Sequence, residues 1–222
     1  MKDRDGFQMS ESIKLGVVLS FAGGFMDAYS YMCRGHVFAN AQTGNMLLLG
    51  VNLASGNWAA ALSYLLPVLA FTVGIAAAYA VRRRMGAVTA VHWRQISVLT
   101  EIIVLAAVCF MPQGINLLAN SLTSLACGIQ VESFRKIRGN GVTTTMCMGN
   151  LRSGTQELCD YASTGDREAM KRGLLYYGII LCFVLGAVAG NFFVAQLAER
   201  AILVCSGILL LAFAMMFVRG KD

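Results

Sequence analysis

The sequence predicts an all-α, polytopic membrane protein of about six spans, arranged as two inverted repeats of three spans. Hydrophobic residues make up 57% of the 222 residues and charged residues only 14%, whereas a soluble domain carries about a quarter charged residues. Several windows contain roughly 20 apolar residues, enough to cross a bilayer core of about 30 Å as helix. In addition, polar positions of the first half recur in the second half.

Four apolar windows are the clearest candidate spans. Two of them, 62–81 and 173–197, contain no charged side chain. The other two are 201–218 and 96–111, and Glu101 interrupts the latter. A helix in the core of a soluble protein would be shorter and would carry a polar face. These windows therefore favour membrane spans.

Residues 1–14 form a charged and polar segment ahead of the first apolar stretch. They lack the order of basic start, short apolar core and small-residue cleavage site that defines a signal peptide. We expect an amphipathic or disordered tail. Membrane insertion would then begin with the first hydrophobic segment.

The net charge of +6 comes from basic residues that flank the apolar windows. They lie at 82–84, at 171–172 and at 219–221. This is the distribution of the positive-inside rule, which places such residues and both termini in the cytoplasm. It favours the lipid bilayer as partner and argues against a nucleic-acid partner.

An internal repeat appears when the second half is shifted onto the first by 105 residues. Glycines, acids and a Gly-Asn pair then coincide. The matched pairs are Gly23 with Gly128, Asp27 with Glu132, Tyr29 with Phe134, Gly44 with Gly149 and Asn45 with Asn150. We expect a first membrane repeat over 15–112 and a second over 113–218.

The first apolar segment of each repeat is too long for one straight crossing. Residues 14–52 would form about 58 Å of helix, and Gly35, Asn40 and Gly44 interrupt its centre. Either the segment is one crossing with a broken helix or it is two short crossings. Charge favours one crossing, because 82–84 and 219–221 then lie on the same side. Three crossings per repeat make the two repeats inverted copies.

The polar residues at these breaks predict a solute site. Irregular backbone at membrane depth is tolerated only where it is buried in protein or lines a wet cavity. Inverted-repeat transporters place their substrate and ion sites at such broken helices. The predicted site residues are Asp27, Gln42, Thr43, Gly44, Asn45, Gln130, Glu132, Thr144, Thr145, Gly149 and Asn150.

The ionisable residues at membrane depth are candidates for proton or cation coupling, since each costs about 2.5–3.5 kcal/mol on insertion. The candidates are Asp27, Glu132, Glu101 and Arg34. Structural alternatives remain open. Glu132 can pair with Arg135 or Lys136 at helical spacing, Asp27 can pair with Arg34, and the small and amide residues can serve helix packing.

Several kinds of chemistry find no support in the sequence. The seven cysteines form no CxxC pair, and neither His36 nor His92 has a second ligand at metal spacing. No nucleophile with a base and no phosphate-binding glycine loop is present. We therefore expect no enzyme activity, metal or cofactor.

The chain resembles the YoaK family of bacterial membrane proteins. The resemblance rests on GGFMDAYSYM (23–32) and QTGN (42–45) in the first half, and on GIQ (128–130), the TT pair (144–145) and MGN (148–150) in the second. It covers about 15–218 and implies an integral inner-membrane protein of about six spans. One departure is Met148, where the family pattern favours threonine; Thr145 is the candidate replacement.

Taken together, these features predict a secondary transporter of a small polar or ionic solute that works by alternating access around the two broken helices. A dimeric ion or small-solute channel is the alternative, because small residues on several spans leave a homodimer open. A membrane scaffold or sensor without transport is the second alternative.

Overall fold

The computed structural model describes residues 12–85, 93–135, 141 and 143–217, and this part of the chain is all-α. The predicted fold class is therefore confirmed at that level. Predicted features at 1–11, His92, Lys136 and 218–221 lie outside the described residues. The helices are α1 (Ile13–Cys33), α2 (Gln42–Ala54), α3 (Trp58–Met85), α4 (Trp93–Val108), α5 (Asn116–Ser133), α6 (Cys147–Thr164), α7 (Arg167–Leu197) and α8 (Ile202–Met215), with short 3-10 helices η2 (Gln113–Ile115) and η3 (Ala198–Ala201).

Local sequence signals explain several helix ends. Ser12 caps α1, because its hydroxyl accepts the N–H of Leu15 at 3.2 Å. Asp166 caps α7 in the same way through the N–H of Glu168 at 2.9 Å. The preceding Gly165 ends α6 in the left-handed conformation, with φ of 73°. The turn between α2 and α3 also contains a left-handed glycine, Gly56.

The buried core lies mainly between α1, α4, α5 and α8. Its fully buried apolar side chains include Leu19 and Phe25 of α1, Leu105 of α4 and Leu209 of α8. Helices α1 and α8 are apolar nearly all round, which is typical of helices enclosed by protein or lipid. The core therefore sits at the centre of the molecule, with α3 and α7 packed across it.

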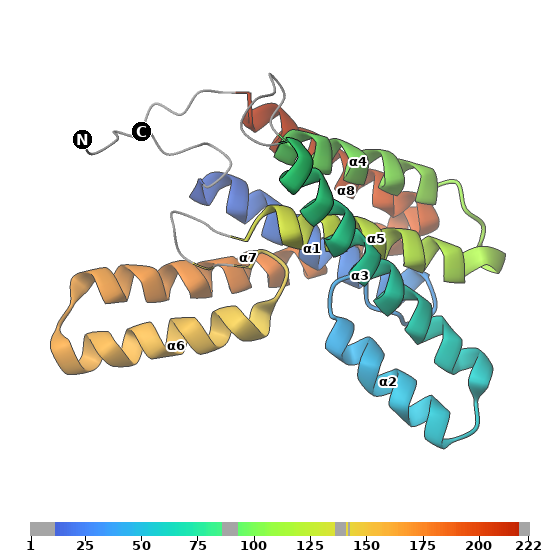
Figure 1. Cartoon of the computed structure of the whole chain (residues 1–222), viewed down its shortest axis with the longest axis horizontal. Coiled ribbons are helices and arrows are strands. Elements are labelled where there is room, and N and C mark those ends of the chain that lie inside the picture. The colour runs from blue at the N-terminus through green and yellow to red at the C-terminus, as the bar shows by residue number, and fades with distance from the viewer. Residues whose placement is uncertain (1–11, 86–92, 136–140, 142, 218–222) are drawn as a thin grey trace.

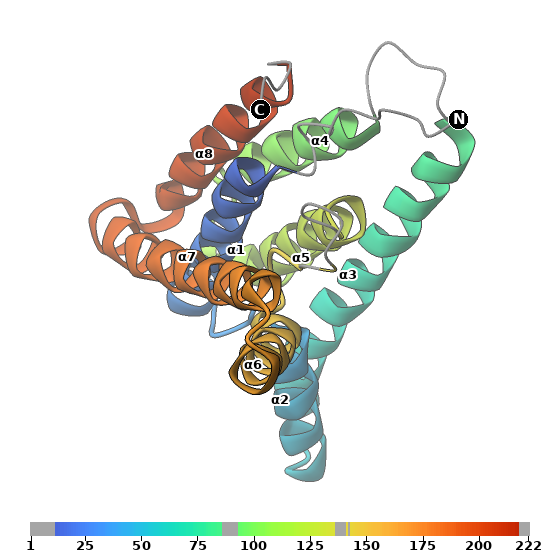
Figure 2. The same cartoon turned by 90° about the vertical axis from the view of Figure 1, so that its left-hand side faces the viewer.

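Two helical hairpins extend from this centre. The α6–α7 pair lies at the lower left of Figure 1 and the α2–α3 pair at the lower right. In Figure 2, α1 descends and α2 continues downward beyond the first break. Figure 1 likewise shows α6 extending in the direction in which α5 ends. The first apolar segment is thus two helices, α1 and α2, joined by a non-helical segment, and in the second the described residues between α5 and α6 are likewise non-helical.

The helices of the two halves pack on each other in an exchanged pattern. α1 packs most extensively on α7, and α3 packs on α5. A Cβ added to Gly24 would collide with the Phe183 carbonyl oxygen, and one added to Gly128 would collide with the Phe71 carbonyl oxygen. Glycine lets these backbones touch, as in membrane helix pairs with small residues at the crossing.

Among the described residues, two helical stretches are long and apolar enough to cross a membrane. They are Trp58–Arg84, with mean hydropathy 2.0, and Arg167–Met215, which contains α7, η3 and α8 and has mean hydropathy 2.3. Only 22% and 17% of their most apolar windows are buried, whereas the core helix of a soluble protein is mostly buried. Their exposed surfaces carry large apolar side chains such as Leu62, Val73, Val188 and Phe192.

Candidate functional site

One cavity of about 750 Å³ lies where the two broken segments meet. The first break is the segment 34–41 between α1 and α2, and the described part of the second break is 134–135, 141 and 143–146. The walls come from both breaks, from the first turns of α2 and α6, and from α1 and α7. The predicted solute-site residues that line it are Asp27, Gln42, Thr43, Thr145 and Gly149.

Most of the cavity wall is apolar. Aromatic rings of Tyr31, Phe38 and Phe183 and the side chains of Met146 and Met148 contribute to it. Ligand sites in proteins commonly combine such apolar walls with a few placed polar groups. Here those groups are the Asp27 carboxyl together with hydroxyl and amide side chains from both halves of the chain.

Backbone geometry explains why helix α1 ends at the first break. Gly35 and His36 both have positive φ, 83° and 60°. Glycine adopts this region without penalty, whereas histidine rarely does. The His36 ring makes an edge contact with Tyr31, and Tyr31 stacks on Phe38, with 4.9 Å between ring centroids in each case. These contacts hold the first break against the last turn of α1.

Asp27 fastens the first break to α1. Its Oδ1 accepts the backbone N–H of Asn40 at 2.7 Å and that of Ala41 at 3.4 Å. The Asn40 amide also donates to the Gly23 carbonyl at 3.2 Å. The Asp27 residue is only 7% exposed. Its carboxyl therefore both lines the cavity and satisfies the N–H groups that precede α2.

Asn45 and Asn150 perform the same task in the two halves. The Asn45 side chain accepts the Phe38 N–H at 3.0 Å and donates to the Phe38 carbonyl at 2.8 Å. Asn150 does the same with Thr143, at 3.2 and 2.6 Å. Both asparagines are buried and neither lines the cavity. They position the breaks, and this is a different task from the solute contact expected of them.

The remaining residues of the QTGN string are divided between support and cavity. Gln42 donates to the Ala39 carbonyl at 2.8 Å and accepts from the Asn45 amide at 2.9 Å. Thr43 lines the cavity from the first turn of α2. Gly44 does not line it; a Cβ there would lie 2.8 Å from the Phe38 ring. Gly44 thus leaves room for the break to fold back over α2.

In the second half, Thr145 reaches toward α1. A Cβ added to Gly23 would lie 2.6 Å from the Thr145 methyl carbon, so the second break packs against the first helix. The Thr145 hydroxyl is buried and has no hydrogen-bond partner among the described residues. Gln130 and Thr144 lie deeper, where the Gln130 amide donates to the Thr144 hydroxyl at 3.4 Å. Gln130 and Thr144 support the break from behind.

Glu132 does not mirror Asp27, and the expected pairing of these acids is wrong. Its carboxylate forms ion pairs with Arg82 at 3.0 Å and Arg135 at 3.8 Å, away from the cavity. The glycine contacts explain the difference. In the second half, Gly128 of α5 touches the backbone of α3; in the first half, the equivalent contact with α7 is made by Gly24 and not by Gly23, the residue aligned with Gly128. The offset between the two repeats is therefore 105 residues at the paired asparagines but 104 residues within helices α1 and α5.

The other two coupling candidates lie outside the cavity lining. Glu101 is fully buried in α4, and both its oxygens lack a hydrogen-bond partner among the described residues. Arg34 is 1% exposed and does not pair with Asp27. Its guanidinium donates to the Tyr29 hydroxyl at 2.8 Å and to the Val108 and Met111 carbonyls at 3.1 and 2.9 Å.

Arg34 belongs to a polar network that ties α1 to two turns. The Tyr29 hydroxyl donates to the Glu199 carbonyl at 3.2 Å, and the Gln113 amide donates to the Glu199 carboxylate at 2.7 Å. The backbone N–H of Glu199, together with the Gln113 amide, holds the pKa of the Glu199 carboxyl below its ordinary value. The sequence reasoning missed Tyr29, Gln113 and Glu199, although an arginine in an apolar run must find acceptors nearby.

The comparison with protein families decides the chain's membership. A family model described as "Protein of unknown function (DUF1275)" matches residues 15–215. This chain belongs to the DUF1275 family. The predicted YoaK resemblance is confirmed, since the YoaK family is DUF1275, a family of membrane proteins. Searches of curated proteins and of solved structures found no match.

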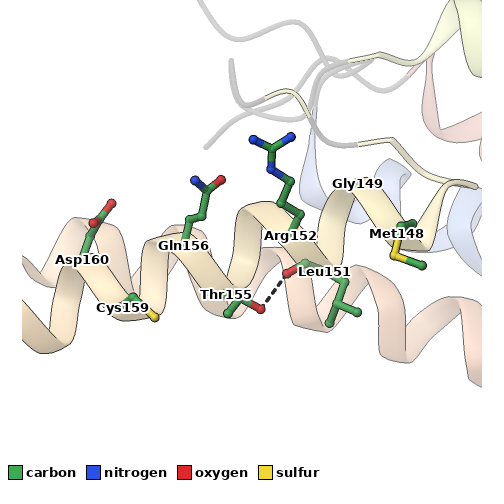
Figure 3. A pocket seen from close by; sticks show the side chains of 8 residues that line it. All are labelled: Met148, Gly149, Leu151, Arg152, Thr155, Gln156, Cys159 and Asp160. Carbon is green, nitrogen blue, oxygen red and sulfur yellow. Dashed lines mark hydrogen bonds between the residues drawn. The ribbon is translucent and has the colours of Figure 1, made fainter.

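A second hollow of the DUF1275 chain lies beside α6 and is lined by that helix alone (Figure 3). Figure 3 shows Arg152, Gln156 and Asp160 along it, with the Thr155 hydroxyl turned back to the Leu151 carbonyl at 2.8 Å. A hollow with one wall brings no groups from different elements together. It therefore adds no candidate site, and the cavity between the breaks remains the leading one.

The cavity of this DUF1275 chain also includes residues that sequence reasoning missed. Phe183, Ala187 and Asn191 of α7 form its wall on the side of the second half. They lie one helical turn apart. A signal for Asn191 exists in the sequence, because the window 173–197 has only two amide side chains, Asn191 and Gln196. The apolar wall residues carry no comparable signal.

Proposed function

We propose that this chain is a secondary transporter of a small solute, with the cavity between the two breaks as its solute site. The observation that carries the proposal is that both breaks, 105 residues apart in the sequence, line one cavity that contains the Asp27 carboxyl. Inverted-repeat transporters build their sites in this manner from discontinuous helices.

The proposed topology has six spans in two inverted repeats, with both termini in the cytoplasm of a bacterial cell. In it, α1 with α2 forms the first span, α5 with α6 the fourth, and α3, α4, α7 and α8 form the others. The exchanged packing of α1 on α7 and α3 on α5 supports two equivalent halves. The basic residues 82–84 at the end of α3 and 171–172 near the start of α7 support the orientation.

The wall of the cavity narrows the proposed solute class. Several aromatic and methionine side chains surround a single carboxyl, with hydroxyl and amide groups near it. Such a wall suits a small amphipathic solute whose polar or cationic end faces Asp27. Tyr31 and Phe38, already stacked on each other, offer ring faces to the apolar or cationic part of the solute.

Asp27 is the residue that we propose couples the binding of a proton or cation to the conformational change. As a carboxylate it accepts charge-assisted hydrogen bonds from the N–H groups of Asn40 and Ala41. Protonation or capture of a cation weakens these bonds and so loosens the start of α2 from α1. A change of charge in the cavity thereby becomes a change in how the first break is held, as alternating access requires.

The test is transport by the purified full chain in liposomes under an inward proton gradient. Small amphipathic amines and neutral polar solutes form the panel, and we expect saturable uptake that a protonophore abolishes. Asp27→Asn should lower gradient-driven uptake about tenfold or more while solute counterflow continues. Asp160→Asn, a change of exposed charge on α6, is the matched control and should leave uptake unchanged.

Three outcomes would overturn parts of this proposal. Gradient-driven uptake that persists in Asp27→Asn removes the coupling role of that residue. Unitary currents in planar bilayers, with flux that does not saturate, favour the channel instead. Retention of every solute at the level of empty liposomes favours the scaffold or sensor.

A further inference from the structure

Another cavity, of about 410 Å³ and separate from the hollow beside α6, lies where the end of α3, the start of α4 and the end of α5 meet. It is distinct from the cavity between the breaks, since the two share no lining residue. We call it the arginine pocket. The described residues that line it are Arg82, Trp93, Arg94, Glu132, Ser133 and Arg135.

Two guanidinium groups of the arginine pocket pair with one carboxylate. Arg82 lies 3.0 Å and Arg135 3.8 Å from the Glu132 carboxylate oxygens. Arg94 donates to the Ser133 carbonyl at 3.1 Å, beside Glu132. Arg82 and Arg135 thus share a single carboxylate, and these three side chains carry a net charge of +1. An anionic group is the chemistry that would complete the pocket.

The corresponding place in the other half is closed by the protein itself. There the end of α1 meets η3, between α7 and α8, through the bond of the Tyr29 hydroxyl to the Glu199 carbonyl, and Arg34 donates to that Tyr29 hydroxyl. Arg34 is 1% exposed, and its donors are satisfied by backbone carbonyls and by Tyr29 and Asn116. In the arginine pocket, by contrast, the side chains of Arg82 and Arg135 are 26% and 55% exposed. The fold therefore does not require an accessible arginine at this position.

The surroundings of the pocket resemble a membrane interface. Arg82 lies near the end of the apolar stretch Trp58–Arg84, and its guanidinium lies over the Tyr79 ring, 5.2 Å from the centroid. Arg94 lies over Trp93 at 5.4 Å. Aromatic residues beside basic ones are typical of the headgroup level of a bilayer. Phosphate groups of lipids also lie at that level.

We propose that the arginine pocket binds the phosphate of an anionic phospholipid headgroup. Arginine is suited to this ligand, because its planar fork matches two phosphate oxygens at once. Basic pockets between membrane helices on the cytoplasmic side commonly hold such headgroups. The inference rests on the membrane placement of α3, and it is independent of whether the cavity between the breaks moves a solute.

The test measures phosphatidylglycerol binding to the purified full chain in nanodiscs of phosphatidylcholine, by native mass spectrometry and by the thermal unfolding midpoint. Phosphatidylglycerol should bind and raise the midpoint, whereas free glycerol phosphate at the same concentration should not. Arg82→Gln should weaken lipid binding about tenfold, which corresponds to about 1.4 kcal/mol. The matched control is Arg83→Gln, which removes the same charge from an exposed neighbour outside the pocket and should change binding less than about twofold.

A second variant, for which stronger lipid binding is expected, distinguishes a specific loss of the pocket from misfolding. Glu132→Gln removes the carboxylate that competes for the arginines, so we expect it to strengthen phosphatidylglycerol binding several-fold. Equal losses of phosphatidylglycerol binding in Arg82→Gln and Arg83→Gln would show that diffuse positive charge attracts the lipid, and would overturn the proposed binding in the pocket. Binding of free glycerol phosphate as tightly as of lipid would overturn the lipid assignment. Binding unchanged in Arg82→Gln, or weakened in Glu132→Gln, would also contradict the proposal.

Discussion

At the residue scale, Asn45 and Asn150 show how a polar side chain becomes essential to a site without touching a ligand. Each pairs with both the N–H and the carbonyl of a residue seven positions earlier. Backbone that leaves a helix inside an apolar environment loses its own hydrogen bonds, and an unsatisfied group there costs several kcal/mol. An asparagine amide supplies one acceptor and one donor at once, and it therefore matches the two groups that the break exposes.

We expect Asn45→Ala and Asn150→Ala each to lower the free energy of unfolding by about 1–3 kcal/mol, because two buried backbone groups lose their partners. The measurement is thermal unfolding of the purified chain in detergent. Asn52→Ala is the matched control; this amide bonds only to Leu48 within its own helix, so its loss should change stability by less than about 0.5 kcal/mol. Wild-type stability of both break variants would show that the amides serve another purpose.

At the scale of the elements, the crossings of α1 with α7 and of α3 with α5 depend on glycine. Backbone carbonyls of one helix lie where the side chain of Gly24, Gly74, Gly128 or Gly186 would otherwise be. Neither backbone can move away without loosening the core that the helices share. In lipid, where the hydrophobic effect does not drive helix association, close approach of helix backbones strengthens the van der Waals packing that holds helices together.

Gly24→Ala and Gly128→Ala should each destabilise the chain by about 1–3 kcal/mol or more, since the added methyl group meets rigid backbone. Gly178→Ala, in α7 with nothing within 4 Å of the added Cβ, is the control. It should raise stability by about 0.5–1 kcal/mol through the better helix propensity of alanine. Thermal unfolding midpoints of the three variants decide the matter, and a stable Gly24→Ala chain would contradict the crossing geometry.

At the scale of the whole molecule, the two hairpins α2–α3 and α6–α7 end in matching turns. Ser55-Gly56-Asn57 and Thr164-Gly165-Asp166 each place a glycine in the left-handed conformation, with φ of 70° and 73°. In the proposed inverted topology these equivalent turns lie on opposite sides of the membrane. With two crossings per broken segment they would lie on the same side, so their location distinguishes six spans from eight.

Single cysteines at Ser55 and Thr164, both exposed, test this topology in a background without other cysteines. For six spans we expect a membrane-impermeant thiol reagent to label only one of them in intact cells and the other only after the cells are opened. The seven native cysteines, which are all free, must be replaced first. Labelling of both positions from the same side would rule out the six-span arrangement.

The sequence by itself determined the all-α class, the position of the breaks and the family. Composition sets the first, because few charged residues and long apolar windows permit only helices in lipid. Gly35, Asn40 and Gly44 mark the first break, because a helix tolerates such residues poorly. These properties depend on the residues along the chain, so they can be read without coordinates.

Only the tertiary structure decided which polar residues face the cavity. One residue on a helix corresponds to a rotation of about 100°, so the change of shift from 105 to 104 directs Asp27 into the cavity and Glu132 toward the arginine pocket. The tertiary structure also places the side chains of Asn45 and Asn150 on the breaks, and it brings Phe183 and Asn191 of α7 to the cavity wall. Side-chain direction and long-range packing follow from how the helices cross, and a periodic apolar sequence is compatible with many crossings.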